Sequence, residues 1–253
     1  MPRLARTKSN SGIYHIMMRG VNKQTIFEDD EDKQRFLETI ARFKHVCKYE
    51  MYAYCLMDNH VHLLIKERVD SISNSIKRIS SSYVYWFNKK YDRSGHLFQE
   101  RFRSENVETW TSFLKVLRYI HQNPLKAGLA HNVLDSKWTS IDEYLGKPIL
   151  ININPALKYF SKDRQEALNL LIDFMGQKND DKCLDDTAPP AISDREVKDY
   201  LQTLGIPNTS TLQQLKKEKR DEILAALKRI EGVSLRQLSR VTGISKSVIQ
   251  RIQ

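Results

Sequence analysis

Hydrophobic and polar residues follow two different patterns along the first half of the chain. Residues 13–19 (IYHIMMR) and two later runs, 49–57 and 60–67, are largely apolar, short and bounded by turn residues, which predicts strands. The last two runs are separated by an Asp-Asn pair, a combination typical of turns, so we expect them to form a hairpin. A further run at 102–110 predicts a fourth strand.

Three longer stretches have apolar residues three or four positions apart, the spacing of an amphipathic helix. These stretches are residues 28–48, 71–91 and 111–123. Side chains that can cap or end a helix lie at their boundaries. The expected caps are Asp29 and Asp30 for the first helix and Thr111 or Ser112 for the third, which Pro124 is expected to end.

The predicted order is strand, helix, strand, strand, helix, strand, helix. This order is typical of an α+β fold in which helices cover an antiparallel sheet, the ferredoxin-like arrangement. A further helical pattern follows, and then a polar segment with two adjacent prolines that we interpret as a linker. We therefore divide the chain into a basic tail (1–12), a main α+β domain (13–147), a helical extension (148–176), a linker (177–191) and an all-α C-terminal domain (192–253).

The end of the chain has the pattern of a helix-turn-helix, in which Gly243 lies between two short helices. The second helix would present Lys246, Gln250 and Arg251, whose side chains can reach phosphates and base edges of DNA. The alternative is a small helical bundle with a glycine in a loop. The apolar positions expected inside are Leu235, Leu238, Val241, Ile244, Val248 and Ile252.

The charge balance favours an anionic partner. The chain has 41 Lys and Arg residues against 31 Asp and Glu residues, a formal net charge of +10. Nucleic acid is the obvious candidate, although many basic proteins bind no polyanion, so the charge alone leaves both alternatives open.

The cysteines and the lengths of the apolar runs indicate in which cellular compartment the protein is expected. Cys47, Cys55 and Cys183 are odd in number and far apart, so they indicate neither a disulfide framework nor a zinc knuckle. The basic N-terminus lacks the apolar core of a signal peptide, and no run of about 18 apolar residues occurs. We therefore expect a cytoplasmic protein that does not interact with membranes.

Two histidines, His60 and His62, interrupt an apolar strand. Side chains at positions i and i+2 of a strand point the same way, while Val61 between them points to the opposite face. Two imidazoles so placed can converge on one divalent cation. A His-x-His pair also occurs by chance and in other hydrolases, so the pair needs a partner.

The third predicted helix offers that partner. Lys115, Tyr119 and Asn123 are four residues apart and therefore share one face beside the apolar stripe. Asn123 could add an oxygen ligand, and Tyr119 could be a nucleophile near the metal. From the helix alone, a half-buried tyrosine with a solvated hydroxyl is the simpler interpretation.

Four segments of the chain resemble a known protein family. They are YHIMMRGVNKQTIF, AYCLMDNHVHLLI, WFNKKYDRSGHLFQERFRS and LRYIHQNPLKAGL, which occur in that order between about residues 13 and 147. Together they resemble the REP-associated tyrosine transposases, a branch of the single-tyrosine HUH transposases. One departure is Asp58, where the family often has a proline; aspartate also forms turns.

The resemblance implies an HUH nuclease fold and a set of site residues. Its metal-binding His-hydrophobic-His motif corresponds to His60 and His62, its nucleophile to Tyr119 and its third metal ligand to Asn123. It implies that bound Mg²⁺ or Mn²⁺ polarises a phosphate of single-stranded or hairpin DNA, and that Tyr119 attacks to form a 5′-phosphotyrosyl intermediate. The family includes dimers, whereas this branch looks monomeric, so the oligomeric state stays open.

Several cations could contact the DNA or assist the tyrosine. Lys115 and Arg118 flank Tyr119 and could favour its deprotonation. His15 is the remaining histidine of interest, because a neighbouring strand could bring it near the site. Predicted contacts to the DNA backbone are Lys89, Lys90, Arg93, Arg101 and Arg103.

Two functions are therefore compatible with the sequence. The first is a metal-dependent single-stranded DNA endonuclease and strand transferase that acts on hairpin-forming repeats. The alternative is a DNA-binding regulator that retains the transposase scaffold and acts through its helix-turn-helix, which would also bind duplex DNA.

Overall fold

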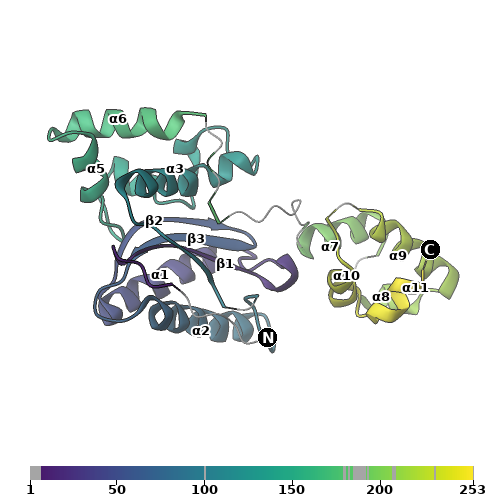
Figure 1. Cartoon of the computed structure of the whole chain (residues 1–253). Helices are drawn as coiled ribbons and strands as arrows, with labels where there is room; N and C mark the ends of the chain where they lie inside the picture. Colours follow the sequence, from purple (N-terminus) through teal and green to yellow (C-terminus); the bar gives the residue numbers. More distant parts are fainter. Residues whose placement is uncertain are drawn as a thin grey trace.

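The computed structural model describes residues 7–99, 101–178, 181, 183–184, 192, 194–206, 209–230 and 232–252. Figure 1 shows the whole chain coloured along the sequence. None of the described helices combines the length and the apolar character needed to cross a membrane.

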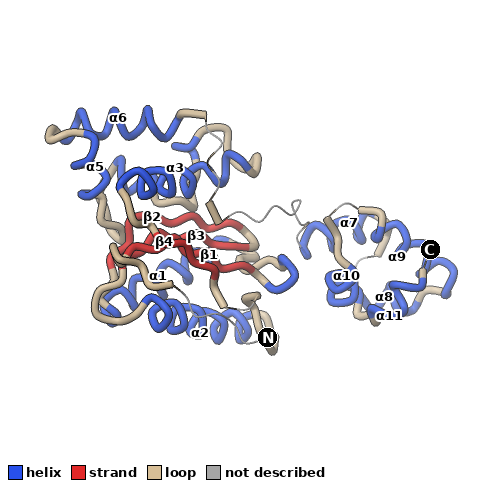
Figure 2. Tube along the Cα trace, in the orientation of Figure 1, coloured by secondary structure: helices blue, strands red, loops and turns tan. Residues whose placement is uncertain are grey.

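A four-stranded antiparallel sheet forms the centre of the first part of the chain (Figure 2). The strands are β1 (Ile13–Arg19), β2 (Glu50–Met57), β3 (His60–Lys66) and β4 (Arg103–Asn106), in the order β2-β3-β1-β4. β2 and β3 form the predicted hairpin, and β1 pairs with both β3 and β4. The predicted α+β fold with an antiparallel sheet and flanking helices is thereby confirmed.

Two helices cover one face of this sheet, α1 (Asp30–Cys47) and α2 (Ile72–Lys90) (Figure 1). The Asp29 carboxylate accepts a hydrogen bond from the Asp32 N–H, so the predicted cap at Asp29 is confirmed. The stripe predicted for α2 is buried: Ile72, Ile76, Ile79, Tyr83 and Phe87.

The helix α3 (Trp110–Lys126) lies on the opposite face, against β2 and β3, with α6 (Arg164–Gly176) packed outside it. Both predicted boundaries of α3 were wrong. Thr109 is the N-cap, because its hydroxyl accepts from the Ser112 N–H while the Ser112 hydroxyl accepts from the Thr109 N–H, a reciprocal capping box. Pro124 lies inside the last turn, where it has no N–H to donate to the Ile120 carbonyl, and α3 continues two residues further, to Lys126.

Shorter elements complete the first part of the chain. The first lies between β1 and α1 in the sequence, and the other three lie between α3 and α6. They are η1 (Val21–Lys23), η2 (Val133–Asp135), α4 (Ile141–Leu145) and α5 (Asn154–Phe160).

The described C-terminal residues are helical and have a hydrophobic cluster of their own. Around Gly243, whose φ of 67° is left-handed, α10 (Leu235–Thr242) and α11 (Lys246–Arg251) form the predicted pair of short helices. One apolar position was wrong: Val248 is 37% exposed, and the residue of α11 that is buried is Ile249, its neighbour in the sequence. The helices are α7 (Asp194–Thr203), α8 (Thr209–Gln214), α9 (Lys217–Lys228), α10 (Leu235–Thr242) and α11 (Lys246–Arg251).

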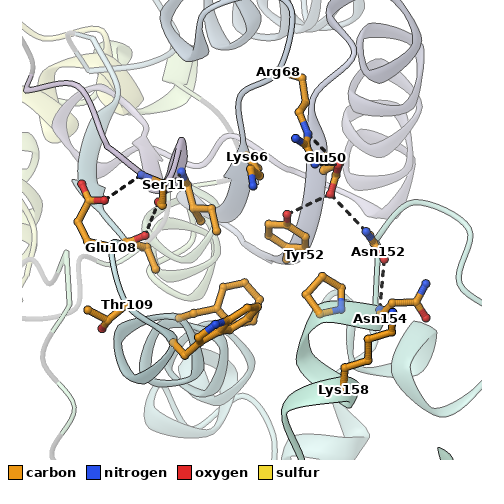
Figure 3. Close-up of a pocket in the computed structure, with 15 residues that line it drawn as sticks. Ser11, Glu50, Tyr52, Lys66, Arg68, Glu108, Thr109, Asn152, Asn154 and Lys158 are labelled. Carbon is orange, nitrogen blue, oxygen red and sulfur yellow. Dashed lines mark hydrogen bonds and ion pairs between the residues drawn. The ribbon is translucent and has the colours of Figure 1, made fainter. Parts of the chain in front are cut away.

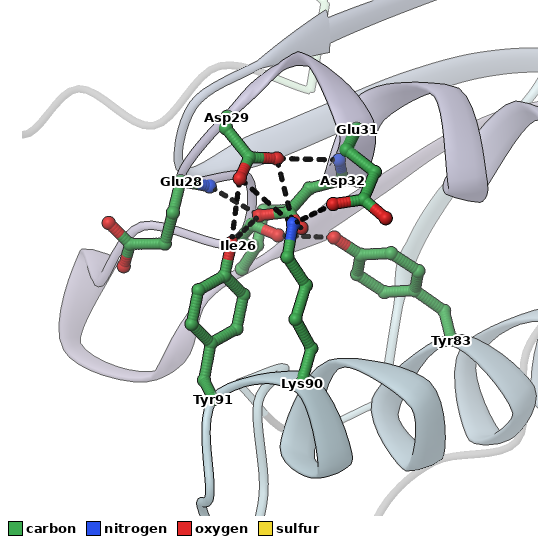
Figure 4. A network of polar contacts seen from close by, with 8 residues as sticks. All are labelled: Ile26, Glu28, Asp29, Glu31, Asp32, Tyr83, Lys90 and Tyr91. Atoms are coloured by element: carbon green, nitrogen blue, oxygen red, sulfur yellow. Dashed lines mark hydrogen bonds and ion pairs between the residues drawn. The ribbon is translucent and has the colours of Figure 1, made fainter.

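An ionic network joins the start of α1 to the end of α2 (Figure 4). The Lys90 ammonium lies 2.8 Å from carboxylate oxygens of Asp29, Glu31 and Asp32. The Asp32 side chain is fully buried and also accepts from the Tyr91 hydroxyl at 2.8 Å. Partial burial opposes the charge of Lys90, but the hydrogen bonds to Asp29 and Asp32 outweigh it and raise the pKa of Lys90.

The buried His121 of α3 should make the fold sensitive to acid. Its Nδ1 lies 2.9 Å from the Leu117 carbonyl oxygen and its Nε2 lies 2.8 Å from the Ser140 hydroxyl. Burial lowers the pKa of His121 to about 4, from 6.5, although the bond to Leu117 acts in the opposite direction. Protons therefore bind the unfolded chain first, and this contribution to stability is lost as pH falls from about 6.5 through about 4.

We expect His121→Gln to remove part of this acid sensitivity. Between about pH 7 and pH 4.5 the wild type should lose about 2 to 3 kcal/mol through this group, as measured by urea unfolding. His45→Gln is the matched control, because His45 is exposed near the end of α1. An equal pH dependence in wild type and His121→Gln would contradict the assignment.

Candidate active site

The face of the sheet below α3 carries three histidines. In the register of β1 and β3, Met17 lies opposite His62 and Arg19 opposite His60, so these side chains share one face. His15, two positions before Met17, points to the same face. Tyr119 of α3 lies over this face and is only 2% exposed, so the interpretation of a half-buried tyrosine with a solvated hydroxyl does not hold.

The four aromatic rings form one cluster. The centroid of the Tyr119 ring lies 5.5 Å from that of His62 and 5.7 Å from that of His15. The rings of His60 and His62 are 5.0 Å apart and nearly perpendicular. The structure thus brings Tyr119 beside the His-x-His pair, as the sequence predicted, and adds His15 to it.

Hydrogen bonds orient both imidazoles of the pair. His60 Nδ1 lies 2.6 Å from the Asn59 side-chain oxygen, at the turn of the β2–β3 hairpin. His62 Nδ1 lies 2.9 Å from His15 Nε2. In each histidine Nδ1 is therefore engaged by a neighbour, and Nε2 is the atom that remains for a ligand.

Both imidazoles are held in the neutral form. Burial, with a smaller contribution from the Arg19 charge, lowers the pKa of His60 to about 3. Burial and the neighbouring His60, His15 and Arg19 hold the pKa of His62 well below its usual range. A neutral imidazole is the form that binds metal ions, so the pair is chemically suited to a divalent cation.

Asn123 lies one helical turn after Tyr119. Its side-chain amide donates a hydrogen bond of 2.9 Å to the Tyr119 carbonyl oxygen, which leaves its own oxygen as an acceptor. Two neutral imidazoles and an amide oxygen are a donor set that fits a divalent transition metal such as Mn²⁺. The assignment of Asn123 as third ligand stays a prediction.

Two cations near the tyrosine, Lys126 and Arg19, are not among those that we predicted. The Lys126 ammonium lies 5.0 Å from the centre of the Tyr119 ring, and the Arg19 charge also acts on Tyr119. Arg118 instead forms an ion pair of 2.7 Å with Asp181 and lies over the Phe174 ring, because it points to the outer side of α3. Lys115 is half-buried on the same helix.

The predicted DNA contacts lie in different surroundings. Lys90 is engaged by three carboxylates of its own chain, and Arg93 donates to the Gln24 side-chain oxygen at 3.1 Å. The other positions are exposed, and their contacts to DNA stay predictions. These exposed positions are Lys89, Arg101, Arg103, Lys246, Gln250 and Arg251.

Two residues near the histidines were missed by sequence reasoning. Glu105 of β4 lies opposite His15 in the register, and its carboxylate is 3.6 Å from His15 Nδ1. Cys183 joins them: potential ligand atoms of His15, Glu105 and Cys183 all lie within 4.8 Å of one another. The only sequence signal was the alternation along residues 102–110, which places Glu105 on one face without showing which strand is its neighbour.

A large cavity of about 790 Å³ lies elsewhere (Figure 3). It is lined by Ile13 and Lys66, which pair at one end of the β1–β3 ladder, whereas Arg19 and His60 pair at the other end. Tyr52, Asn152 and Lys158 also line it. The cavity contains neither Tyr119 nor any of the three histidines, so it is separate from the candidate active site.

The residues of this site lie in a segment that matches a known protein family. Residues 8–123 match the model of the IS200-like transposase family, a range that contains the three histidines, Tyr119 and Asn123. No curated protein is significantly similar to the chain in sequence.

Two solved structures match parts of the chain. One is a REP-associated tyrosine transposase bound to a REP hairpin, with a TM-score of 0.51 and 19% identity, covering 60% of this chain and 90% of that chain. The other, proposed to be a transposase from Deinococcus radiodurans R1, has a TM-score of 0.35 and 15% identity, covering 48% of this chain and 97% of that one. With the antiparallel sheet, the histidine pair and the tyrosine helix in place, the match assigns residues 8–123, a little under half of the chain, to the IS200-like transposase family, whose members are DNA-cleaving enzymes.

Proposed function

We propose that the protein is a metal-dependent single-stranded DNA endonuclease and strand transferase that acts on hairpin-forming repeat DNA. The observation that carries this proposal is the position of Tyr119, whose ring lies 5.5 Å from that of His62 in a cluster with His60 and His15. A nucleophile beside two neutral imidazoles is an arrangement suited to phosphodiester cleavage with a bound cation.

Tyr119 is the proposed nucleophile. Its phenolic oxygen forms a bond to phosphorus, and the bond from phosphorus to the 3′ oxygen of the DNA breaks. The phenol loses its proton and the leaving 3′ oxygen gains one, so a 5′-phosphotyrosyl enzyme and a free 3′-hydroxyl result. Attack by a DNA 3′-hydroxyl on the phosphotyrosine reverses these steps and joins strands.

Other residues prepare this step. His60, His62 and Asn123 would hold Mg²⁺ or Mn²⁺, which supplies charge neutralisation and orientation of the scissile phosphate when bound. Lys126, 5.0 Å from the Tyr119 ring, would stabilise the phenolate as it forms. The burial of Tyr119 strengthens these electrostatic interactions, because little water screens them.

Removal of the metal or of either imidazole should abolish most of the cleavage. We expect EDTA, His60→Gln and His62→Gln each to lower cleavage of a single-stranded hairpin substrate by about a hundredfold or more, since the ligand shell is then incomplete. Gel electrophoresis of labelled hairpins taken from the repeats flanking the gene would measure the rate.

The matched control is His131→Gln, because His131 is exposed and outside the cluster. It should cleave like the wild type. Cleavage that survives EDTA, or a His62→Gln variant as active as His131→Gln, would be incompatible with the proposed metal site.

A second candidate function has support from the C-terminal helices. Lys246, Gln250 and Arg251 are exposed on α11, where they could reach the DNA backbone and base edges. These residues would add duplex affinity to the enzyme, or would make the protein a regulator that binds DNA without cutting it. The two alternatives differ in whether the cleavage assay gives a metal-dependent product.

A further inference from the structure

We propose that His15 and Glu105 form a relay that positions His62 as a metal ligand. In this relay the His62 Nδ1–H donates to His15 Nε2, and the His15 Nδ1–H points at the Glu105 carboxylate. His15 is thus a positioning residue, which acts on the cation through His62. The inference rests on the proposed function, because it concerns the same metal site.

The first support is the distance between the two imidazoles. His15 Nε2 and His62 Nδ1 are 2.9 Å apart, the length of a hydrogen bond between ring nitrogens. Their ring centroids are 5.2 Å apart, with planes tilted by 30°. One of the two nitrogens must donate and the other must accept.

Only one direction of this bond leaves His62 able to bind a metal. A neutral imidazole carries one N–H, and the other nitrogen has the lone pair. If His15 donated, the His62 proton would be on Nε2, and neither nitrogen of His62 would be free to ligate. If His62 donates from Nδ1, its Nε2 lone pair stays available.

Glu105 favours the productive direction. Its carboxylate oxygen lies 3.6 Å from His15 Nδ1, too far for a good hydrogen bond but close enough for an electrostatic attraction. A proton on His15 Nδ1 is therefore stabilised, and His15 Nε2 becomes the acceptor. The sheet fixes this contact, because His15 and Glu105 are direct partners in the β1–β4 register.

In His60, too, an acceptor beside Nδ1 keeps the proton on that nitrogen, but the acceptor is a different residue. Its Nδ1 lies 2.6 Å from the Asn59 side-chain oxygen, an acceptor that also selects the Nδ1–H form. Both histidines of the pair would then offer Nε2. The burial of His15, which is 0% exposed, prevents water from replacing it as the acceptor for His62.

A competing role for His15 is direct metal binding together with Glu105 and Cys183, whose potential ligand atoms lie within 4.8 Å of one another. In that case His15 Nδ1 would carry a lone pair and Cys183 would contribute a thiolate. The relay role and the ligand role therefore require opposite tautomers of His15. They also differ for Cys183, which binds the metal only if His15 is a direct ligand.

Tautomers and metal affinity test the relay without using the cleavage reaction. In the metal-free protein, ¹⁵N NMR should show the protons of His15 and His62 on Nδ1. Titration with Mn²⁺ alone, followed by electron paramagnetic resonance, should give a dissociation constant about tenfold to a hundredfold weaker for His15→Leu. His15→Gln should restore most of the affinity, because its amide oxygen can accept from His62 Nδ1.

Two further variants complete the design. Cys183→Ser should bind Mn²⁺ like the wild type, and Glu105→Gln, at a half-exposed surface site that tolerates change, should bind it a few times more weakly. If His15→Leu fails to fold, as judged by circular dichroism, the Mn²⁺ affinity of Glu105→Gln and the NMR tautomers of His15 and His62 still test the relay.

Three results would overturn the relay. The first is an NMR spectrum that places the His62 proton on Nε2. The second is wild-type Mn²⁺ affinity in a folded His15→Leu variant or in Glu105→Gln, and the third is a large loss of Mn²⁺ affinity in Cys183→Ser. Failure of the proposed function has a separate outcome, because a protein that binds Mn²⁺ through the relay but cleaves no hairpin would retain the positioning role and lose the nuclease.

Discussion

Tyr119→Phe should eliminate the covalent DNA adduct and lower cleavage by at least about a thousandfold, because the attacking oxygen is gone and nothing else in the reaction replaces a lost nucleophile. The variant should keep its fold, since the phenyl ring fills the space beside His15 and His62 that the Tyr119 ring occupies. Mass spectrometry of the protein after incubation with Mn²⁺ and a single-stranded hairpin would detect the adduct. Peptide mapping would assign it to Tyr119.

A second tyrosine-to-phenylalanine variant, at a position away from the active site, serves as the control for Tyr119→Phe. Tyr159 of α5 is 51% exposed and packs on Trp110, so Tyr159→Phe should form the adduct at the wild-type rate. Metal-free binding of the hairpin should be equal in both variants, which separates chemistry from affinity. An adduct that persists in Tyr119→Phe would show that a different residue is the nucleophile.

Lys90→Met should lower the free energy of unfolding by about 3 kcal/mol, because it leaves the buried Asp32 carboxylate without its cation. Asp32 is fully buried, and its remaining partners are the Tyr91 hydroxyl and the Glu28 N–H, both neutral. Asp29 and Glu31 would then repel Asp32 at the start of α1. Urea unfolding at neutral pH, followed by circular dichroism, would measure the change.

Lys89→Met is a close control, since Lys89 precedes Lys90 on α2 but is exposed. Its effect should stay within about 0.5 kcal/mol. If the two variants are equally stable, the network in Figure 4 contributes nothing measurable to stability. A large loss for Lys90 alone would also explain why this lysine is a poor candidate for a DNA contact, although it belongs to a basic run.

The example of Lys90 shows where local sequence reasoning ends. The run of basic residues at 89–103 contains exposed positions such as Arg101 and Arg103 as well as Lys90, which is enclosed by carboxylates of another helix. The three carboxylates are about 60 positions away in the sequence, and only the packing of α1 against α2 brings them together. Residue type therefore predicted the charge but not its partner.

Arg118 and Lys126 show the same limit on α3. Arg118 is next to Tyr119 in the sequence, but neighbouring residues of a helix point in different directions, and Arg118 pairs with Asp181 instead. Lys126 follows Tyr119 by seven residues, two helical turns, and lies over its ring. Because Pro124 does not end α3 where we predicted, Lys126 is still helical and reaches the tyrosine.

By itself the sequence determined the kinds and order of the elements of the transposase domain, because helices and strands place apolar residues at different and recognisable spacings. It also determined that His60 and His62 share a face, since alternation along a strand is a local property. Only the tertiary structure decided that His15 hydrogen-bonds His62, that Glu105 lies beside His15 and that Lys126 covers Tyr119. These contacts depend on strand register and on packing between layers, which join residues far apart in the chain and leave no periodic signal within it.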